Sequence, residues 1–230
     1  MEYDGFSLNV SQLDWRKYFF MVYFGPQPKT DAVFAHGSSV RSEELDRKIC
    51  GLATSLLFNE KTNHVIINGL STEWCNANSV AYSGAETWLG YFTEKEINDV
   101  IVAPEAKHTA AECNMIISMA KDRGWKSITV LAFPHHLPRV MSQWVECLKR
   151  ASSDLKVYPR SFGGIDIHMT TSKPLLGGDA VKGVLMDQVS LETINYERYC
   201  NPAGKDEKGS FTPNATPEDT IAYMMRRDEQ

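Results

Sequence analysis

Short apolar runs alternate with helical patterns along the first two thirds of the chain. The apolar runs are four to six residues long, and each ends at or beside a small, polar or turn-forming residue. Between them, apolar residues recur at intervals of three and four, which is typical of amphipathic helices. The runs predict strands at residues 31–36, 64–68, 100–103, 127–131 and 155–158. Helices are predicted at residues 11–24, 43–58, 84–92, 110–123 and 139–150.

The alternation of short strands with longer helices indicates βαβ units. We therefore expect a three-layer α/β fold, a Rossmann-like open and mostly parallel sheet with helices on both faces. Strands buried on both faces are continuous apolar runs, and these runs have that character. The alternation fades after Tyr158, so we expect an α/β domain at residues 1–160, with its core at 31–158, and a C-terminal appendage at 161–230 packed on the same domain.

Three further segments carry weaker patterns. Residues 70–82 are expected to form a long polar loop. In the appendage, residues 176–199 contain a predicted helix and residues 218–227 form a short terminal one, with a polar linker rich in Gly and Pro between them. The pattern assigns no role to the appendage.

Composition narrows the class of protein. The 230 residues are 43% hydrophobic and 23% charged, with a net charge of −5, which argues against a nucleic-acid binder, because such a protein needs a basic face. The most apolar stretch covers residues 18–24, far short of the roughly 20 residues of a membrane span. The five cysteines are odd in number and form no CxxC pair, and the acidic start is no secretory signal. We expect reduced thiols, a cytoplasmic location and no membrane partner, and a homo-oligomer is left open.

In an open parallel sheet, ligands bind beyond the carboxyl ends of the strands. That rule selects the loops at 36–42, 68–83, 103–109, 133–138 and 159–164. No GxGxxG follows the first strand, and the GxxxxGK[ST], GxSxG and HExxH motifs are also absent. The candidate chemistry must therefore come from isolated residues in these loops.

The first loop contains Gly37, Ser38 and Ser39 ahead of a predicted helix. Backbone N–H groups and hydroxyls in such a place can bind an anion. The alternative is an ordinary turn in which Ser39 or Ser42 caps the helix. The loop after the second strand begins with Asn68, a further candidate for ligand binding.

The third loop holds several ionisable residues. Thr109 and Glu112 have the spacing of a capping box, as do Ser83 and Glu86 before the preceding helix, so both glutamates have a structural explanation beside a ligand-binding one.

Three other residues of that loop, Glu105, Lys107 and His108, have no such structural explanation. They lie where ligands are expected.

The fourth loop reads Phe-Pro-His135-His136-Leu-Pro138-Arg139. Pro138 suits the first turn of a helix, which puts His136 and Arg139 at its N-terminus. A cation there opposes the helix dipole by about 0.3–1 kcal/mol, which favours an anion opposite Arg139. A histidine in that place should stay mostly neutral, as a general base or a hydrogen-bond donor must. The alternative is a surface helix start with incidental charge.

The chain resembles the SanA/YdcF-like family, a domain of unknown function. The resemblance covers about residues 31–158 and depends on the order and spacing of short motifs. These are Val33-Phe34-Ala35-His36-Gly37, Asn68-Gly69, Glu86, Glu105-x-x-x-Thr109-x-x-Glu112 and His136-Leu137-Pro138-Arg139. The chain departs from the family at Leu70, where Gly is expected, and at Cys113, where Asn is common.

The resemblance implies a Rossmann-like fold, functions in the cell envelope or on small molecules, and S-adenosylmethionine binding for some members. It does not fix a reaction. The membrane anchor of some relatives is missing from this sequence, and the 70–82 loop and the appendage look particular to this chain.

Three hypotheses remain open. The first is an enzyme that hydrolyses a small anionic metabolite, phosphorylated or nucleotide-like, or transfers a group from it, with His136 as general acid/base, Glu105 as its partner and Arg139 as anion holder. The second is a module that binds S-adenosylmethionine or a nucleotide without turnover. The third is a divalent-metal version of the first, with Glu105, Glu112, His108 and His136 as ligands.

Overall fold

The computed structural model describes residues 12–37, 42–94, 96–133, 136–161 and 214–229. Its centre is a sheet of five parallel strands in the order β3-β2-β1-β4-β5. The strands are β1 (Ala32–Ala35), β2 (Val65–Ile67), β3 (Val100–Val102), β4 (Ser127–Leu131) and β5 (Lys156–Arg160). This order, with helices on both faces, is that of a Rossmann-like α/β fold, so the predicted fold class is confirmed.

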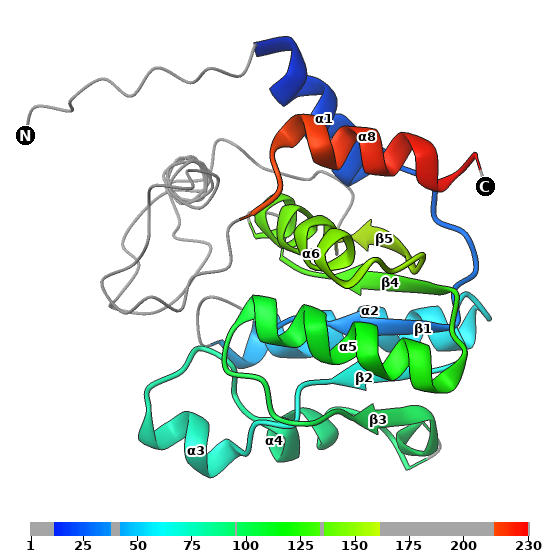
Figure 1. Ribbon diagram of the computed structural model, residues 1–230. Coiled ribbons are helices and arrows are strands. Elements are labelled where there is room, and N and C mark those ends of the chain that lie inside the picture. The colour runs from blue at the N-terminus through cyan, green and yellow to red at the C-terminus, as the bar shows by residue number, and fades with distance from the viewer. Residues whose placement is uncertain (1–11, 38–41, 95, 134–135, 162–213, 230) are drawn as a thin grey trace, which may run out of the picture.

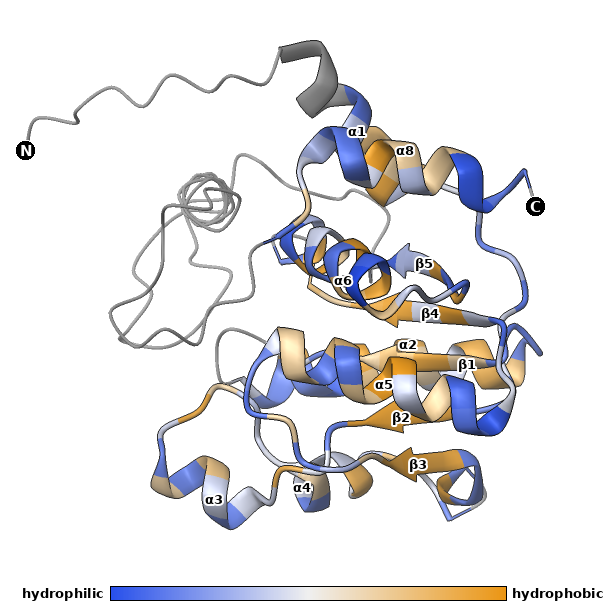
Figure 2. Ribbon diagram, in the orientation of Figure 1, coloured by the Kyte–Doolittle hydropathy of each residue, from blue (hydrophilic) through white to orange (hydrophobic). Residues whose placement is uncertain are grey.

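Alternate residues of each strand face opposite sides of the sheet and enter separate cores. In β1, Ala32 and Phe34 pack into one core, whereas Val33 and Ala35 pack into the other. All four side chains are fully buried or nearly so. The central strands β1 and β2 are thus apolar throughout, because both faces of the sheet are covered there, and Figure 2 shows their hydrophobic residues in orange.

Helices α2 (Glu43–Phe58), α3 (Thr72–Ala77) and α4 (Ala85–Leu89) supply the core on one face. Helices α5 (Thr109–Arg123) and α6 (Leu137–Ala151) cover the other face, and α5 lies in front of the sheet in Figure 1. A short 3₁₀ helix, η1 (Ile97–Asp99), leads into β3.

Helix α6 is buried on nearly all sides. Ten of its 15 residues are buried, because it lies between the sheet and an outer pair of helices. These are α1 (Gln12–Phe24) and α8 (Pro217–Arg227), which lie side by side in Figure 1 and contact each other and α6. The predicted helices at the two ends of the chain are therefore present.

Helix α8 also closes the free edge of the sheet at β5. The backbone N–H of Val157 donates to the hydroxyl of Tyr223 at 2.8 Å, and the Val157 carbonyl accepts from Nη1 of Arg227 at 2.6 Å. Pro159 has no N–H, and its carbonyl accepts from Nε2 of Gln27 at 2.8 Å. Side chains from α8 and from the segment after α1 thus satisfy backbone groups that a sheet edge usually exposes.

Two local predictions need correction. Residues 70–82, expected to be a loop, contain α3, and the helix expected at 84–92 ends at Leu89. Serine at the N-cap starts α3, because Oγ of Ser71 accepts from the N–H of Trp74 at 3.1 Å. The helix predicted within 176–199 lies outside the described residues.

The strand order reverses between β1 and β4, which are neighbours in the sheet although all the elements from α2 to α5 separate them in sequence. At this switch point the segments after the two strands diverge, which leaves a crevice for a ligand. The carboxyl ends of the strands point to the left in Figure 1, and α5 and α6 begin on that side. Among the described residues, no helix has the length and the apolar composition needed to cross a membrane.

Candidate functional site

A hollow of about 180 Å³ opens at this end of the sheet. The segments that follow β1, β2 and β3 border it, together with the first turns of α5 and α6. Its lining residues are Gly37, Asn68, Leu70, Val80, Tyr82, Ala106, Lys107, His108, Thr109, Glu112, His136 and Arg139.

His36 directly follows β1 and is 1% exposed. Its Nε2 lies 3.1 Å from Nε1 of Trp144 on α6, and its Nδ1 lies 3.0 Å from Oε2 of Glu112 on α5. An indole N–H can only donate, so Nε2 of His36 is the acceptor of that bond. The proton of the neutral ring is therefore on Nδ1, and His36 donates it to the carboxylate of Glu112.

Asn68 follows β2 and holds the other oxygen of the same carboxylate. Its Nδ2 donates to Oε1 of Glu112 at 2.8 Å and to the carbonyl of Ala106 at 2.7 Å. Its Oδ1 accepts from the N–H groups of Leu70 and Ala106 at 3.1 and 3.2 Å. The donors and acceptors of this amide are thus all engaged with the protein, and Asn68 positions both Glu112 and the segment after β3.

Glu112 is held as an ionised carboxylate. Burial raises its pKa, but His36, the hydrogen bond from Asn68 and the nearby His136 act in the opposite direction, and the resulting pKa lies below the ordinary value of a glutamate. The side chain is 12% exposed and lines the hollow. A negative charge is therefore present in the hollow at neutral pH.

His136 is the N-cap residue of α6 and is 5% exposed. A guanidinium nitrogen of Arg139, one turn further on, lies 2.8 Å from Nδ1 of His136. Because guanidinium can only donate, Nδ1 accepts, and the proton of the neutral ring is on Nε2.

The segment between β3 and α5 brings a second cation to the hollow. The ammonium of Lys107 lies 5.2 Å from the ring centroid of Trp74 on α3, a cation–π distance. His108 is the N-cap of α5, since its Nδ1 accepts from the N–H of Ala111 at 3.2 Å. The hollow therefore combines two cations, Lys107 and Arg139, with the carboxylate of Glu112.

Two glycines permit close approach around the hollow. A Cβ on Gly37 would lie 3.0 Å from Cδ2 and 3.1 Å from Cβ of Tyr82, so the tyrosine ring packs directly over this glycine. A Cβ on Gly69 would lie 2.0 Å from the carbonyl oxygen of Ala103, where the segments after β2 and β3 meet. A side chain at Gly69 would clash with the backbone, whereas one at Gly37 would require the Tyr82 ring to shift by a few tenths of an ångström.

Both predicted capping boxes are wrong. The N-cap of α5 is His108 rather than Thr109, and Glu112 turns to His36 and Asn68 instead of back to the helix start. The N-cap of α4 is Gly84, whose helix has no side-chain cap.

In the second of these predicted boxes, Ser83 donates to the buried carboxylate of Asp46 in a short hydrogen bond. Glu86 accepts from the N–H of Thr72 at 2.7 Å, which lowers its pKa. Both side chains thus have partners outside α4.

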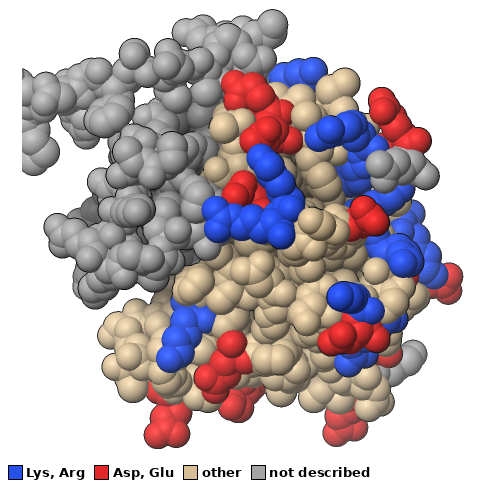
Figure 3. Space-filling model, in the orientation of Figure 1, with Lys and Arg blue, Asp and Glu red and all other residues tan. Residues whose placement is uncertain are grey.

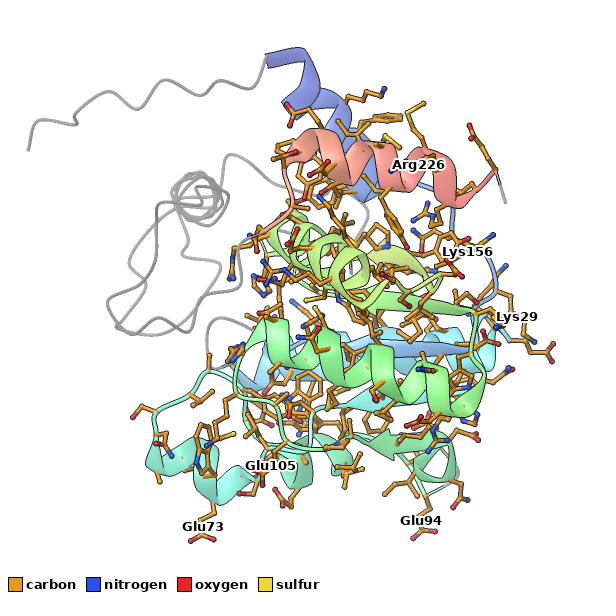
Figure 4. All side chains as sticks on the ribbon, in the orientation of Figure 1. Lys29, Glu73, Glu94, Glu105, Lys156 and Arg226 are labelled. Atoms are coloured by element: carbon orange, nitrogen blue, oxygen red, sulfur yellow. The ribbon has the colours of Figure 1, made fainter. Side chains whose placement is uncertain are left out.

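The structure brings most of the predicted site residues together, but not all of them. Gly37, Asn68, Lys107, His108, Thr109, Glu112, His136 and Arg139 line the same hollow. Glu105 and Glu86 are exposed and do not line it, and Figure 4 locates Glu105 toward α3 and α4, away from α6. Ser38, Ser39 and His135 lie outside the described residues.

Sequence reasoning missed three residues of this site: His36, Trp144 and Tyr82. The apolar run predicts only that His36 ends a strand, although a histidine at the carboxyl end of the first strand lies where ligands are expected. Tyr82 donates from its hydroxyl to the Asn68 carbonyl at 2.7 Å, and burial raises its pKa. Nothing in the local sequence marks Tyr82 or Trp144.

Two observations bear on ligand class. Within the described residues, no group of three or more His, Cys, Asp and Glu side chains is arranged to hold a metal ion. Positive and negative side chains are interspersed over the face in Figure 3, with no continuous basic surface on the part of that face that is described.

The described cysteines, Cys50, Cys75, Cys113 and Cys147, are buried free thiols.

The fold and the hollow thus define a Rossmann-like α/β protein with a candidate site at its switch point. A comparison with models of known protein families finds no match, and a comparison with proteins of curated function finds none. The case for a function therefore depends on the geometry of the site.

Proposed function

We propose that this chain is an enzyme that acts on a small anionic metabolite, phosphorylated or nucleotide-like, by hydrolysis or group transfer. The observation that carries the proposal is the pairing of Arg139 with Nδ1 of His136 inside the hollow. This pairing keeps the ring neutral and its proton on Nε2, beside a permanent positive charge.

In this proposal Arg139 and Lys107 attract the anionic group of the substrate. The Nε2–H of His136 donates a hydrogen bond to the oxygen on which negative charge grows as the bond to the leaving group breaks. A preorganised donor of this kind stabilises the transition state more than the ground state.

The tautomer sharpens the role expected for His136. A neutral ring that gave up its Nε2 proton would become an imidazolate, so the ring serves better as a donor that keeps its proton than as a general base. Glu105 was expected to be the partner of His136. We assign that role to Glu112, because Glu112 lines the hollow with His136 and Glu105 does not.

We also keep membership of the SanA/YdcF-like family as a proposal. It is supported by the way the two most specific motifs come together, since Thr109 and Glu112 of the first and His136 and Arg139 of the second line the same hollow. Glu105, the first residue of its motif, is the member that does not.

The test is a screen of the full chain against small phosphate monoesters, phosphate diesters and nucleotides, with product detection by mass spectrometry. For a substrate that turns over, His136→Ala should lower kcat by about 100- to 1,000-fold, as expected for loss of one oxyanion donor. His136→Gln should retain part of the activity, because its amide can still donate a hydrogen bond.

The matched control is His64→Ala. His64 lies at the amino end of β2, where its ring contacts Trp125 at a centroid distance of 5.8 Å, and it is not part of the hollow. This variant should keep wild-type kcat. Equal activity of wild type and His136→Ala would overturn the proposal.

Binding without turnover would favour the alternative of a module for S-adenosylmethionine or a nucleotide. Calorimetry with these two ligands, alongside the activity screen, separates the outcomes. Tight binding of either one, with no product formed from any compound tested, would replace the enzymatic proposal with the binding one.

A further inference from the structure

The hollow holds opposite charges, and their arrangement restricts the kind of anion that fits. Its lining includes the ionised carboxylate of Glu112 and two cations, Arg139 on α6 and Lys107 in the segment between β3 and α5. An anionic group near Glu112 would meet a like charge in a poorly solvated site, which is unfavourable. The part of a ligand that faces Glu112 must therefore be a hydrogen-bond donor.

Glu112 has acceptor capacity to spare. A carboxylate offers roughly four lone-pair sites on its two oxygens. His36 uses one site on Oε2 and Asn68 uses one on Oε1. Each oxygen of the ionised carboxylate therefore keeps a lone-pair site for a donor on a ligand.

A hydroxyl on the ligand suits the site better than an ammonium as the group that donates to Glu112. Among the described residues that line the hollow, the cations Arg139 and Lys107 outnumber the carboxylate of Glu112, and this positive charge opposes a further cation. A hydroxyl donates to Glu112 without adding charge, and its hydrogen bond to an ionised acceptor is among the stronger ones.

The remaining wall of the hollow is apolar. Leu70, Val80 and the ring of Tyr82 line it, and the hydroxyl of Tyr82 is engaged with the Asn68 carbonyl. This wall suits the carbon skeleton of a ligand, and Gly37 permits it because the Tyr82 ring packs directly over that residue. The lining of the hollow thus offers three kinds of surface: cations for a negative group, a carboxylate for hydroxyls and apolar side chains for carbon.

We propose that the hollow recognises a hydroxylated anion, in which Arg139 and Lys107 bind the negative group and Glu112 accepts from a hydroxyl on the carbon skeleton, as in a sugar phosphate or a sugar acid. This inference rests on the hollow being the working site, as in the proposed function, and names the class of molecule that the site takes.

Calorimetry on the full chain tests this with two pairs of probes. Ribose 5-phosphate is compared with pentyl phosphate, and gluconate with hexanoate, so that each pair shares its charged group and differs in hydroxyls. The hydroxylated member should bind at least about tenfold more tightly, the effect of one hydrogen bond to a charged group. The pair with the tighter binding identifies the negative group as phosphate or carboxylate. Equal affinity within both pairs overturns the proposal.

Two variants assign the effect to residues. In Glu112→Gln the preference for the hydroxylated member should fall to less than about threefold, while pentyl phosphate binds as well as before or better. In Arg139→Gln both members should weaken by the same factor. If a folded Glu112→Gln protein still prefers the hydroxylated member, another group binds the hydroxyl, and the assignment to Glu112 is overturned.

Two features keep the test decisive. If Glu112→Gln does not fold, the comparison within each pair on the wild-type chain and on Arg139→Gln still decides. Because calorimetry measures binding alone, hydroxyl preference without turnover would support this inference and count against the enzymatic proposal. Turnover without hydroxyl preference would do the reverse.

Discussion

His36 and His136 follow β1 and β4, the neighbouring strands on either side of the switch point, and both are at least 95% buried from solvent. Burial therefore does not distinguish them. Their partners do, because His36 lies between an indole donor and a carboxylate, whereas His136 accepts from a guanidinium. In each pair the partner that can only donate fixes the tautomer.

The two tautomers are opposite. His36 carries its proton on Nδ1 and donates it in a hydrogen bond to Glu112, while its Nε2 accepts from Trp144. His136 carries its proton on Nε2 and lines the hollow. Because His136 lines the hollow and His36 does not, the proposed function assigns the framework role to His36 and the ligand contact to His136.

The largest expected difference between the two histidines is in stability. His36→Ala removes a buried side chain, leaves the indole N–H of Trp144 without its acceptor and takes one donor from Glu112. We expect the free energy of unfolding to fall by about 3–5 kcal/mol, as for breaking a buried charged network. His136→Ala should lower it by only about 1 kcal/mol. Urea unfolding of the two variants measures both values.

An intermediate variant sharpens this prediction. In His36→Asn the amide nitrogen can still donate to Glu112, but the acceptor for Trp144 is lost, so the loss of stability should fall between those of His36→Ala and wild type. Equal losses in His36→Ala and His136→Ala would remove the distinction between the two residues.

The fold was predictable because its signals are local. Most strands contain a short apolar run, and the long helices repeat apolar residues at helical spacing, so the sheet and the helices that cover it follow from the sequence. The exception is α3, which has only six residues. So short a helix has little periodicity, and α3 depends on contacts such as that of Trp74 with Lys107.

The site was predictable only in part, for the same reason. Pro138 and the end of a strand mark His136 and Arg139 locally. The capping-box spacing of Thr109 and Glu112 is also local, but it misled, because the partners of Glu112 are 76 and 44 positions away in the chain. Trp144 lies 108 positions from His36. Only the folded sheet brings such residues together.

A smaller effect tests the tautomers directly. Trp144→Phe keeps an aromatic ring but removes the N–H that donates to His36. We expect a loss of about 1 kcal/mol in stability and a change in the protonation pattern of the His36 ring. Nitrogen-15 NMR of the histidine rings should find Nδ1–H at His36 and Nε2–H at His136 in the wild type. The His136 signals should be unchanged in Trp144→Phe, and the same tautomer at both residues in the wild type would contradict the assignment.

The smallest expected effect concerns the ionised state of Glu112, which His36 and Asn68 favour by lowering its pKa. The pKa of Glu112 in the folded chain lies below its ordinary value of 4.5, so this group adds stability above pH 4.5 that is lost as the pH falls through the folded-state pKa. The reason is that below pH 4.5 the unfolded chain binds a proton at this position more readily than the folded chain.

Glu112→Gln removes that titration, while the other carboxylates remain the same. Urea midpoints measured from about pH 6 to about pH 3 should therefore fall less steeply for Glu112→Gln than for wild type. His136→Ala should keep a slope close to that of wild type, because His136 is the last of the influences on the pKa of Glu112, after His36 and Asn68. If His136→Ala flattened the slope as much as Glu112→Gln, the charge of Glu112 would depend on the ring in the hollow rather than on the framework, and the contrast between the two histidines would be lost.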